Sequence, residues 1–142
     1  MGTSTVNILL VEDDDVDVEA VRRGLKRQKI ANPLTVAADG IEALAILRGE
    51  GDRTPLAKPF IILLDLNMPR MSGLEFLEAL RADPVLSNSV VFVLTTSKDD
   101  EDKTQAYKQH VAGYIVKENV GTAFVDLVTM LDCYWRVVEL PQ

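Results

Sequence analysis

The sequence predicts a doubly wound α/β protein, in which two layers of helices enclose a parallel sheet as a three-layer sandwich. Five short apolar runs rich in β-branched residues alternate along the chain with five segments of helical spacing. Such alternation favours parallel strands joined by crossover helices. The runs are almost continuously apolar, as expected of strands that are buried on both faces.

The expected strands, in chain order, are Val6–Val11, Leu34–Ala37, Phe60–Leu64, Val90–Leu94 and Tyr114–Val116. Each run is short and is bounded by polar or turn-forming residues, which is why it reads as a strand. The expected helices are Val16–Gln28, Gly40–Arg48, Ser72–Ala82, Asp99–Gln109 and Val120–Val138. The segment Gly49–Pro59 mixes glycine, proline and charged residues, and we expect it to form a surface loop.

Two of the helices carry start signals. Asp14, Asp15 and Asp17 suit the beginning of the first helix, because the helix dipole favours negative charge there. Ser72 and Glu75 have the spacing of a capping box, in which two side chains satisfy the free amides of a first turn. These signals support the first and third helices.

The length indicates one domain over residues 1–142, with an extended last helix and a short tail from about residue 120. The composition favours a reducing, cytoplasmic setting. The net charge of −7 argues against nucleic acid as a direct partner, because phosphate binding depends on Lys and Arg. Cys133 is the single cysteine, so no intramolecular disulfide can form. We find no signal segment and no apolar run long enough to span a membrane.

Polar residues follow four of the five expected strands. Glu12 and Asp13 come after the first strand, Asp65 after the third, Thr95 after the fourth and Lys117 after the fifth. In an open parallel sheet, ligands bind beyond the carboxyl ends of the strands, where the strand order reverses. With the order 2-1-3-4-5, the three carboxylates converge at that point, and the threonine and lysine approach from neighbouring strands.

Three converging carboxylates predict a bound divalent cation, since like charges in a poorly hydrated site are costly. Oxygen ligands without Cys or His match Mg²⁺ and disfavour zinc. Beside such a cation, Asp65 can act as a nucleophile that forms an acyl phosphate. Lys117 and Thr95 would then supply the charge and the hydroxyl that the transferred group needs.

Four stretches resemble the signature blocks of bacterial response-regulator receiver domains, namely Leu10–Asp13, Leu64–Leu74, Val93–Thr96 and Gly113–Lys117. The resemblance covers nearly the whole chain and implies the chemotaxis-receiver-like fold, a flavodoxin-like (βα)5 sandwich. It implies a single-domain response regulator without an output domain, phosphorylated by a sensor histidine kinase in a two-component phosphorelay. The chain itself would promote only its own aspartyl phosphorylation and dephosphorylation.

The same resemblance assigns roles to the metal and phosphate residues. Asp65 resembles the phosphoacceptor, Asp13 the direct metal ligand, and Glu12 the partner acid that acts through a metal-bound water. Asn67 would offer its backbone carbonyl to the metal, and Lys117 resembles the phosphate-binding lysine.

The switch residues follow in the same way. Thr95 resembles the switch hydroxyl and Tyr114 the aromatic that moves inward when the hydroxyl engages the phosphoryl group. Phosphorylation would thereby change the surface formed by helix 4, strand 5 and helix 5. The sequence departs from the family at Glu118, where proline with a cis peptide bond is usual. A cis bond before a residue other than proline costs roughly 2.5–4 kcal/mol, so we expect a trans bond there.

A narrower resemblance concerns the end of the chain, where the last helix runs into Tyr134-Trp135 and closes with Leu140-Pro141. It is similar to small receivers paired with phytochrome-type sensor histidine kinases, such as a bacteriophytochrome. Such receivers often form two-fold dimers through helix 4, strand 5 and helix 5. The expected interface residues are Met130, Cys133, Tyr134, Trp135 and Val137.

Two other function classes are weighed against this hypothesis. A Mg²⁺-dependent phosphohydrolase with an aspartyl intermediate would resemble the haloacid dehalogenase group, which places a second Asp where this chain has Asn67. A flavin-binding module is opposed by the acidic residues after the first strand, which would repel phosphate. The signalling switch is therefore favoured.

Overall fold

The computed structural model describes residues 7–27, 33–51, 55–57, 60–66, 71–95 and 107–116. The strands are β1 (Asn7–Val11), β2 (Leu34–Ala37), β3 (Phe60–Leu64), β4 (Val90–Thr95) and β5 (Gly113–Val116). The helices are α1 (Asp15–Arg27), α2 (Gly40–Arg48) and α3 (Gly73–Ala82). All five expected strands and the first three expected helices are confirmed to within one residue at each end. The fourth expected helix is described only from residue 107, and the fifth lies outside the described residues.

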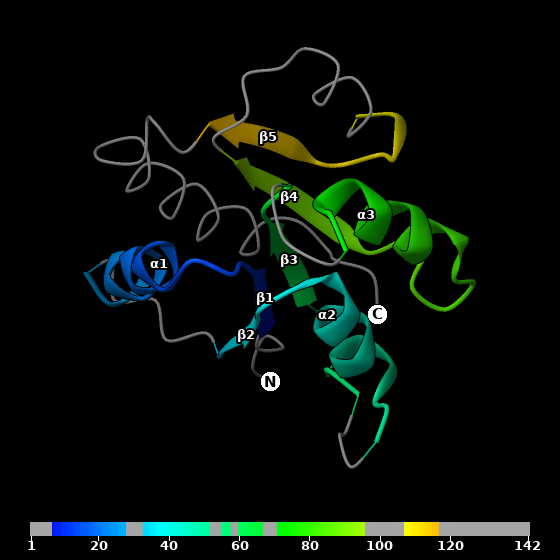
Figure 1. Ribbon diagram of the computed structural model, residues 1–142, viewed down its shortest axis with the longest axis horizontal. Helices are drawn as coiled ribbons and strands as arrows, with labels where there is room; N and C mark the ends of the chain where they lie inside the picture. Colours follow the sequence, from blue (N-terminus) through cyan, green and yellow to red (C-terminus); the bar gives the residue numbers. More distant parts are fainter. Residues whose placement is uncertain are drawn as a thin grey trace, which may run out of the picture.

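The five strands form one parallel sheet in the order β2-β1-β3-β4-β5, which confirms the predicted order (Figure 1). β1 lies between β2 and β3, which are the next two strands along the chain. The strand order therefore reverses between β1 and β3. Among the helices that the structure describes, α1 lies on one side of the sheet, and α2 and α3 lie on the other. None of these helices is long and apolar enough to cross a membrane.

Alternate residues of the central strands supply two separate cores. On one face, Val18, Val21 and Leu25 of α1 pack against a buried group that includes the β1 residues Ile8 and Leu10. On the other face, α2 and α3 pack against the alternate residues of the same strands. All five residues of β3 are buried, with at most 6% of any one exposed. This double burial explains why the strand is continuously apolar in sequence.

Side chains cap the helices that begin at the carboxyl edge of the sheet. Asp14 precedes α1, and its Oδ1 accepts hydrogen bonds from the Val16 and Asp17 amides at 2.8 and 3.4 Å. Before α3, Ser72 Oγ accepts from the Glu75 amide while Glu75 Oε1 accepts from the Ser72 amide, both at 3.2 Å. The predicted capping box is therefore confirmed.

Arg81, in the last turn of α3, binds backbone carbonyls that lie just before the amino ends of two strands. Its guanidinium donates to four backbone carbonyls, those of Ser87, Ser89, Gln109 and His110, over 2.6–3.0 Å. The first two carbonyls precede β4 and the last two precede β5. One side chain thus holds the starts of two strands together, and partial burial lowers its pKa.

Candidate functional site

The ends of β1 and β3 lie level with each other. Val11 is paired with Leu64, so the next residues of the two strands, Glu12 and Asp65, are neighbours. The Asp65 amide donates to the Val11 carbonyl at 3.0 Å, and the Glu12 amide donates to the Ala37 carbonyl of β2 at 2.9 Å. Backbone pairing therefore fixes both residues at the point where the strand order reverses, which is where ligands bind in this architecture.

Three carboxylates gather at this point. Glu12, Asp13 and Asp65, called the acidic cluster below, place one carboxylate oxygen each within 4.8 Å of the others. Glu12 and Asp65 are buried, at 3% and 4% exposure, whereas Asp13 is exposed. The prediction that these residues converge is confirmed.

The acidic cluster fits a hard divalent cation. Mg²⁺ binds oxygen ligands at 2.0–2.1 Å, so two oxygens of one octahedron lie at most about 4.2 Å apart. The limit of 4.8 Å between the three oxygens of the cluster is about 0.6 Å longer than that spacing. The donor set and the geometry therefore fit a divalent cation.

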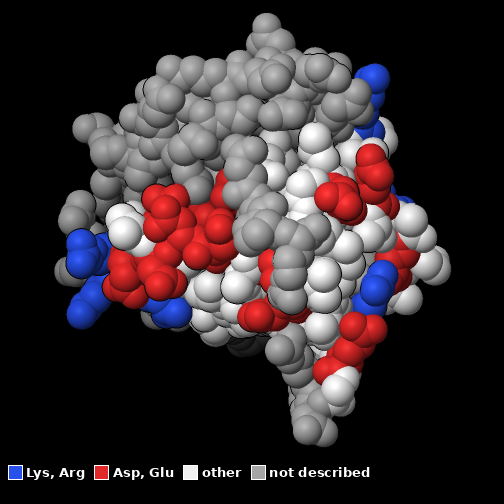
Figure 2. Space-filling view, viewed as in Figure 1, with Lys and Arg blue, Asp and Glu red and all other residues white. Residues whose placement is uncertain are grey.

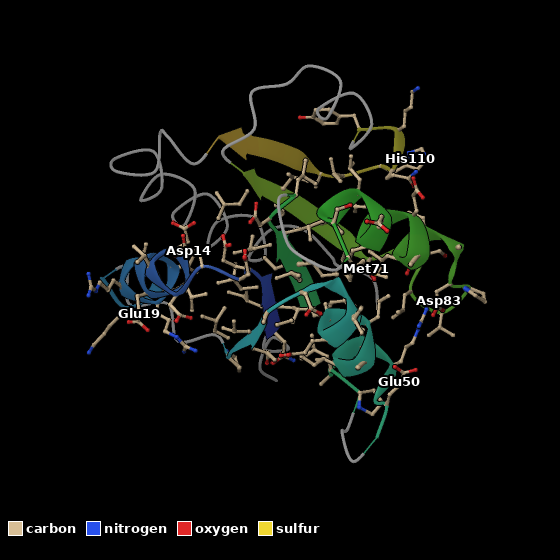
Figure 3. All side chains as sticks on the ribbon, viewed as in Figure 1. Asp14, Glu19, Glu50, Met71, Asp83 and His110 are labelled. Atoms are coloured by element: carbon tan, nitrogen blue, oxygen red, sulfur yellow. The ribbon has the colours of Figure 1, made fainter. Side chains whose placement is uncertain are left out.

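The first turn of α1 lies directly beside the acidic cluster. Glu12 Oε2 accepts a hydrogen bond from the Asp14 amide at 3.3 Å, which orients the Glu12 carboxylate. Asp14 in turn caps the helix, as described above. Figure 2 shows the resulting acidic surface around the start of α1, where Asp13, Asp14 and Asp15 are all exposed, and Figure 3 labels Asp14. This surface favours the approach of cations and disfavours that of free anions.

Backbone register places the predicted switch residues in the next two strands. Thr95 ends β4 and is paired with Val116 of β5, and Tyr114 is paired with Val93. Because Leu64 is paired with Val93, Thr95 lies one residue beyond the level of Asp65. Thr95 is therefore at the same edge of the sheet as the acidic cluster.

The remaining predicted site residues lie outside the described residues. They are Asn67, Lys117, Glu118 and the expected dimer-interface residues Met130, Cys133, Tyr134, Trp135 and Val137.

One buried carboxylate at this edge was not predicted. Asp39 follows β2, is 4% exposed and accepts a hydrogen bond from the Glu42 amide at 2.8 Å as the N-cap of α2. An Asp directly before a helical segment is a recognisable cap signal, and it would have identified this role. Asp39 is not a member of the acidic cluster. Its observed role is to fix the first turn of α2 at this edge of the sheet.

Residues 8–129 match the model of the response regulator receiver domain. The chain belongs to this family. The receiver is 36% identical to response regulator Rcp1 of Synechocystis over 135 residues, which are 94% of this chain and 92% of Rcp1. It is a signalling protein of two-component phosphorelays, in which receivers work with histidine kinases. This membership does not favour the alternative phosphohydrolase.

Two solved structures agree with this assignment. The phosphorylated cyanobacterial phytochrome response regulator RcpA superposes with a TM-score of 0.87 at 33% identity, covering 98% of this receiver and all of that chain. The Mn²⁺-bound form of response regulator Rcp1 gives a TM-score of 0.84 at 34% identity, covering 96% of this receiver and 99% of that chain. The first of these was solved phosphorylated and the second with a divalent metal.

Proposed function

We propose that Asp65 accepts a phosphoryl group from a sensor histidine kinase, with Mg²⁺ as the cofactor. The observation that carries the proposal is the convergence of Glu12, Asp13 and Asp65 at the strand-order reversal of a receiver fold. Asp13 and Asp65 would hold the metal directly, Glu12 would hold it through a water molecule, and Asn67 would contribute its backbone carbonyl. The Mn²⁺-bound Rcp1 structure supports a divalent ion in this family.

The transfer exchanges one bond to phosphorus for another. An Asp65 carboxylate oxygen forms the new P–O bond as the P–N bond of the phosphohistidine breaks, and the histidine nitrogen leaves with the electron pair. Mg²⁺ held by the acidic cluster would neutralise charge on the phosphoryl oxygens. Thr95 donates a hydroxyl hydrogen bond to that group, and the Lys117 ammonium pairs with it. Attack by water later releases orthophosphate and restores the carboxylate.

The transfer acts as a switch, since it biases an equilibrium between two conformations. Thr95 engages the phosphoryl group, Tyr114 moves inward, and the surface of helix 4, strand 5 and helix 5 changes. This surface also carries a homodimer interface that includes Cys133, Trp135 and Val137. Analytical sedimentation of the wild type and of Trp135→Ala tests the dimer. We expect the wild type to dimerise more tightly than the variant, and a wild type that is monomeric at every concentration would contradict the interface.

The phosphoryl donor is a phytochrome-type histidine kinase. Residues 1–142 form a single receiver domain, and the transfer takes place in the cytoplasm. The similarity to RcpA, a phytochrome response regulator, supports this choice of donor. Transfer rates from a panel of histidine kinases test it. We expect a bacteriophytochrome or cyanobacterial phytochrome kinase to be the fastest donor, and a faster unrelated kinase would reject this assignment.

The central experiment is phosphorylation by acetyl phosphate in Mg²⁺, followed by intact-protein mass spectrometry. We expect one phosphoryl group on the wild type, none on Asp65→Asn, and none on the wild type in EDTA. Asp83→Asn is the matched control, because it makes the same chemical change at a carboxylate outside the acidic cluster. Equal labelling of the wild type and Asp65→Asn would exclude Asp65 as the acceptor.

A further inference from the structure

Helix α3 begins unusually close to the peptide that follows the acceptor aspartate. The Gly73 amide donates to the Leu66 carbonyl at 3.0 Å, and Gly73 is buried. A Cβ atom at Gly73 would lie 2.5 Å from Leu66 Cα and 2.6 Å from the Asp65 carbonyl oxygen. Both are backbone atoms, which cannot rotate away. A side chain at Gly73 would therefore displace either the helix or the peptide by about 0.5 Å before the contact reached 3.0 Å.

Hydrogen bonds fix the local backbone on both sides of this contact. The Asp65 amide is held by the Val11 carbonyl of β1 at 3.0 Å, on the other side of the strand. The helix start is held by the reciprocal hydrogen bonds of Ser72 and Glu75. A Cβ at Gly73 would therefore press on the peptide that carries Asp65, whose carboxylate is 4% exposed and belongs to the acidic cluster.

A second glycine shows the opposite situation. Gly40, the first residue of α2, is buried, and a Cβ there would lie 2.8 Å from Met71 Sδ, 2.9 Å from Met71 Cγ and 3.1 Å from Phe76 Cβ. The last of these contacts asks α3 to yield by only a few tenths of an ångström. Figure 3 labels Met71 between α2 and α3. The Met71 side chain is flexible and can move aside. A side chain at Gly40 therefore crowds the same pair of helices without pressing on the Asp65 peptide.

We propose that Gly73 is a positioning residue for phosphoryl transfer, because its lack of a side chain sets where the Asp65 carboxylate lies relative to Glu12 and Asp13. This role rests on the proposed function of Asp65. Mg²⁺ demands near-ideal octahedral geometry, so a carboxylate displaced by half an ångström is a poorer ligand. The same displacement moves the attacking oxygen out of line with the phosphorus atom.

The test compares Gly73→Ala with Gly40→Ala in the full chain, at a temperature where thermal unfolding shows both to be folded. The phosphorylation rate with acetyl phosphate is measured at saturating Mg²⁺, and the Mg²⁺ dissociation constant by calorimetry. For Gly73→Ala we expect a rate lower by about tenfold and weaker Mg²⁺ binding, since misplacement by 1 Å costs on the order of 100-fold. For Gly40→Ala we expect both quantities to stay within about twofold of the wild type, because its effect is confined to packing.

The outcomes separate the two proposals. If the wild type and Gly73→Ala react equally fast and bind Mg²⁺ equally well, the role of Gly73 is wrong while that of Asp65 stands. If the wild type is not labelled, or Asp65→Asn is labelled equally, both proposals fall.

If Gly73→Ala is unfolded under these conditions, the measurements are repeated for both variants and the wild type in trimethylamine N-oxide, which favours the folded state without adding an atom to the site. A rate and a Mg²⁺ affinity of refolded Gly73→Ala equal to those of the wild type overturn the positioning role, and lower values of both support it.

Discussion

Replacing Arg81 with methionine should cost a large share of the folding free energy. Two of the four carbonyls that its guanidinium binds, those of Ser89 and Gln109, form partly buried hydrogen bonds at 2.7 and 2.6 Å. Hydrogen bonds to a charged group contribute about 1.5–3 kcal/mol each when desolvated. The bonds to Ser87 and His110 are exposed, so water replaces them at little cost. Two such bonds give about 3–6 kcal/mol, and we expect Arg81→Met to lower the free energy of unfolding by an amount in this range.

Arg48→Met is the matched control for this change. Arg48 also lies in the last turn of a helix, but its side chain is 38% exposed and it forms an ion pair with Asp83 at 3.0 Å. Surface pairs of this kind contribute about 0–1 kcal/mol. Urea unfolding followed by circular dichroism measures both variants, with the slope checked for constancy. Equal losses in the two variants, or a loss under about 1 kcal/mol in Arg81→Met, would refute the role assigned to the four carbonyl bonds.

Three further predictions concern charge and backbone conformation. Without metal, Asp13→Asn should raise stability by about 1 kcal/mol through reduced repulsion, and Mg²⁺ should then stabilise it less than the wild type in thermal unfolding; equal Mg²⁺ gains would contradict this. The hydrogen bond from the Val85 amide holds the pKa of Asp83 below its usual value of 3.8. The ionised Asp83 carboxylate therefore stabilises the fold fully at pH values above 3.8, and this stabilisation is lost as the pH falls through the lower pKa of the folded state. The stability difference between wild type and Asp83→Asn should shrink on acidification, and a constant difference would reject this linkage. Gly49→Ala should cost at least about 1 kcal/mol in urea unfolding, because its φ is 71° and a Cβ would lie 2.5 Å from the Pro55 ring; a neutral effect would contradict the observed helix end.

The strands were predictable because their burial leaves a direct trace in the sequence. A strand such as Phe60–Leu64, covered on both faces, must be apolar at every position, and the polar residue that ends the run marks the edge of the sheet. The convergence of Glu12, Asp13 and Asp65 then follows from strand order alone. Local hydrogen bonding made the Ser72–Glu75 cap equally predictable.

Contacts between segments that are distant in sequence were not predictable in this way. Arg81 reads as an ordinary polar residue on a helix, because nothing nearby in sequence reveals that the carbonyls before β5 lie within its reach. His110 adopts a left-handed conformation with φ of 58°, which the sequence does not indicate in a residue other than glycine. The crowding at Gly73 likewise depends on how closely α3 approaches the Asp65 peptide. Spacing patterns identify chemical groups, whereas these contacts require the packed chain.

The acidic cluster lies at the ends of two strands that are almost completely buried. Two ionised carboxylates within 4.8 Å would repel each other by at least about 3.5 kcal/mol at an effective dielectric constant of 20. Each fully buried aliphatic side chain of β1 and β3 contributes about 1.5–3 kcal/mol, and nine of the ten residues in the two strands are buried. The burial of these strands therefore contributes more to the folding free energy than such a repulsion costs. A divalent cation bound by the cluster would remove the repulsion, so adding Mg²⁺ should raise the midpoint of thermal unfolding of the wild type, and an unchanged midpoint would contradict this.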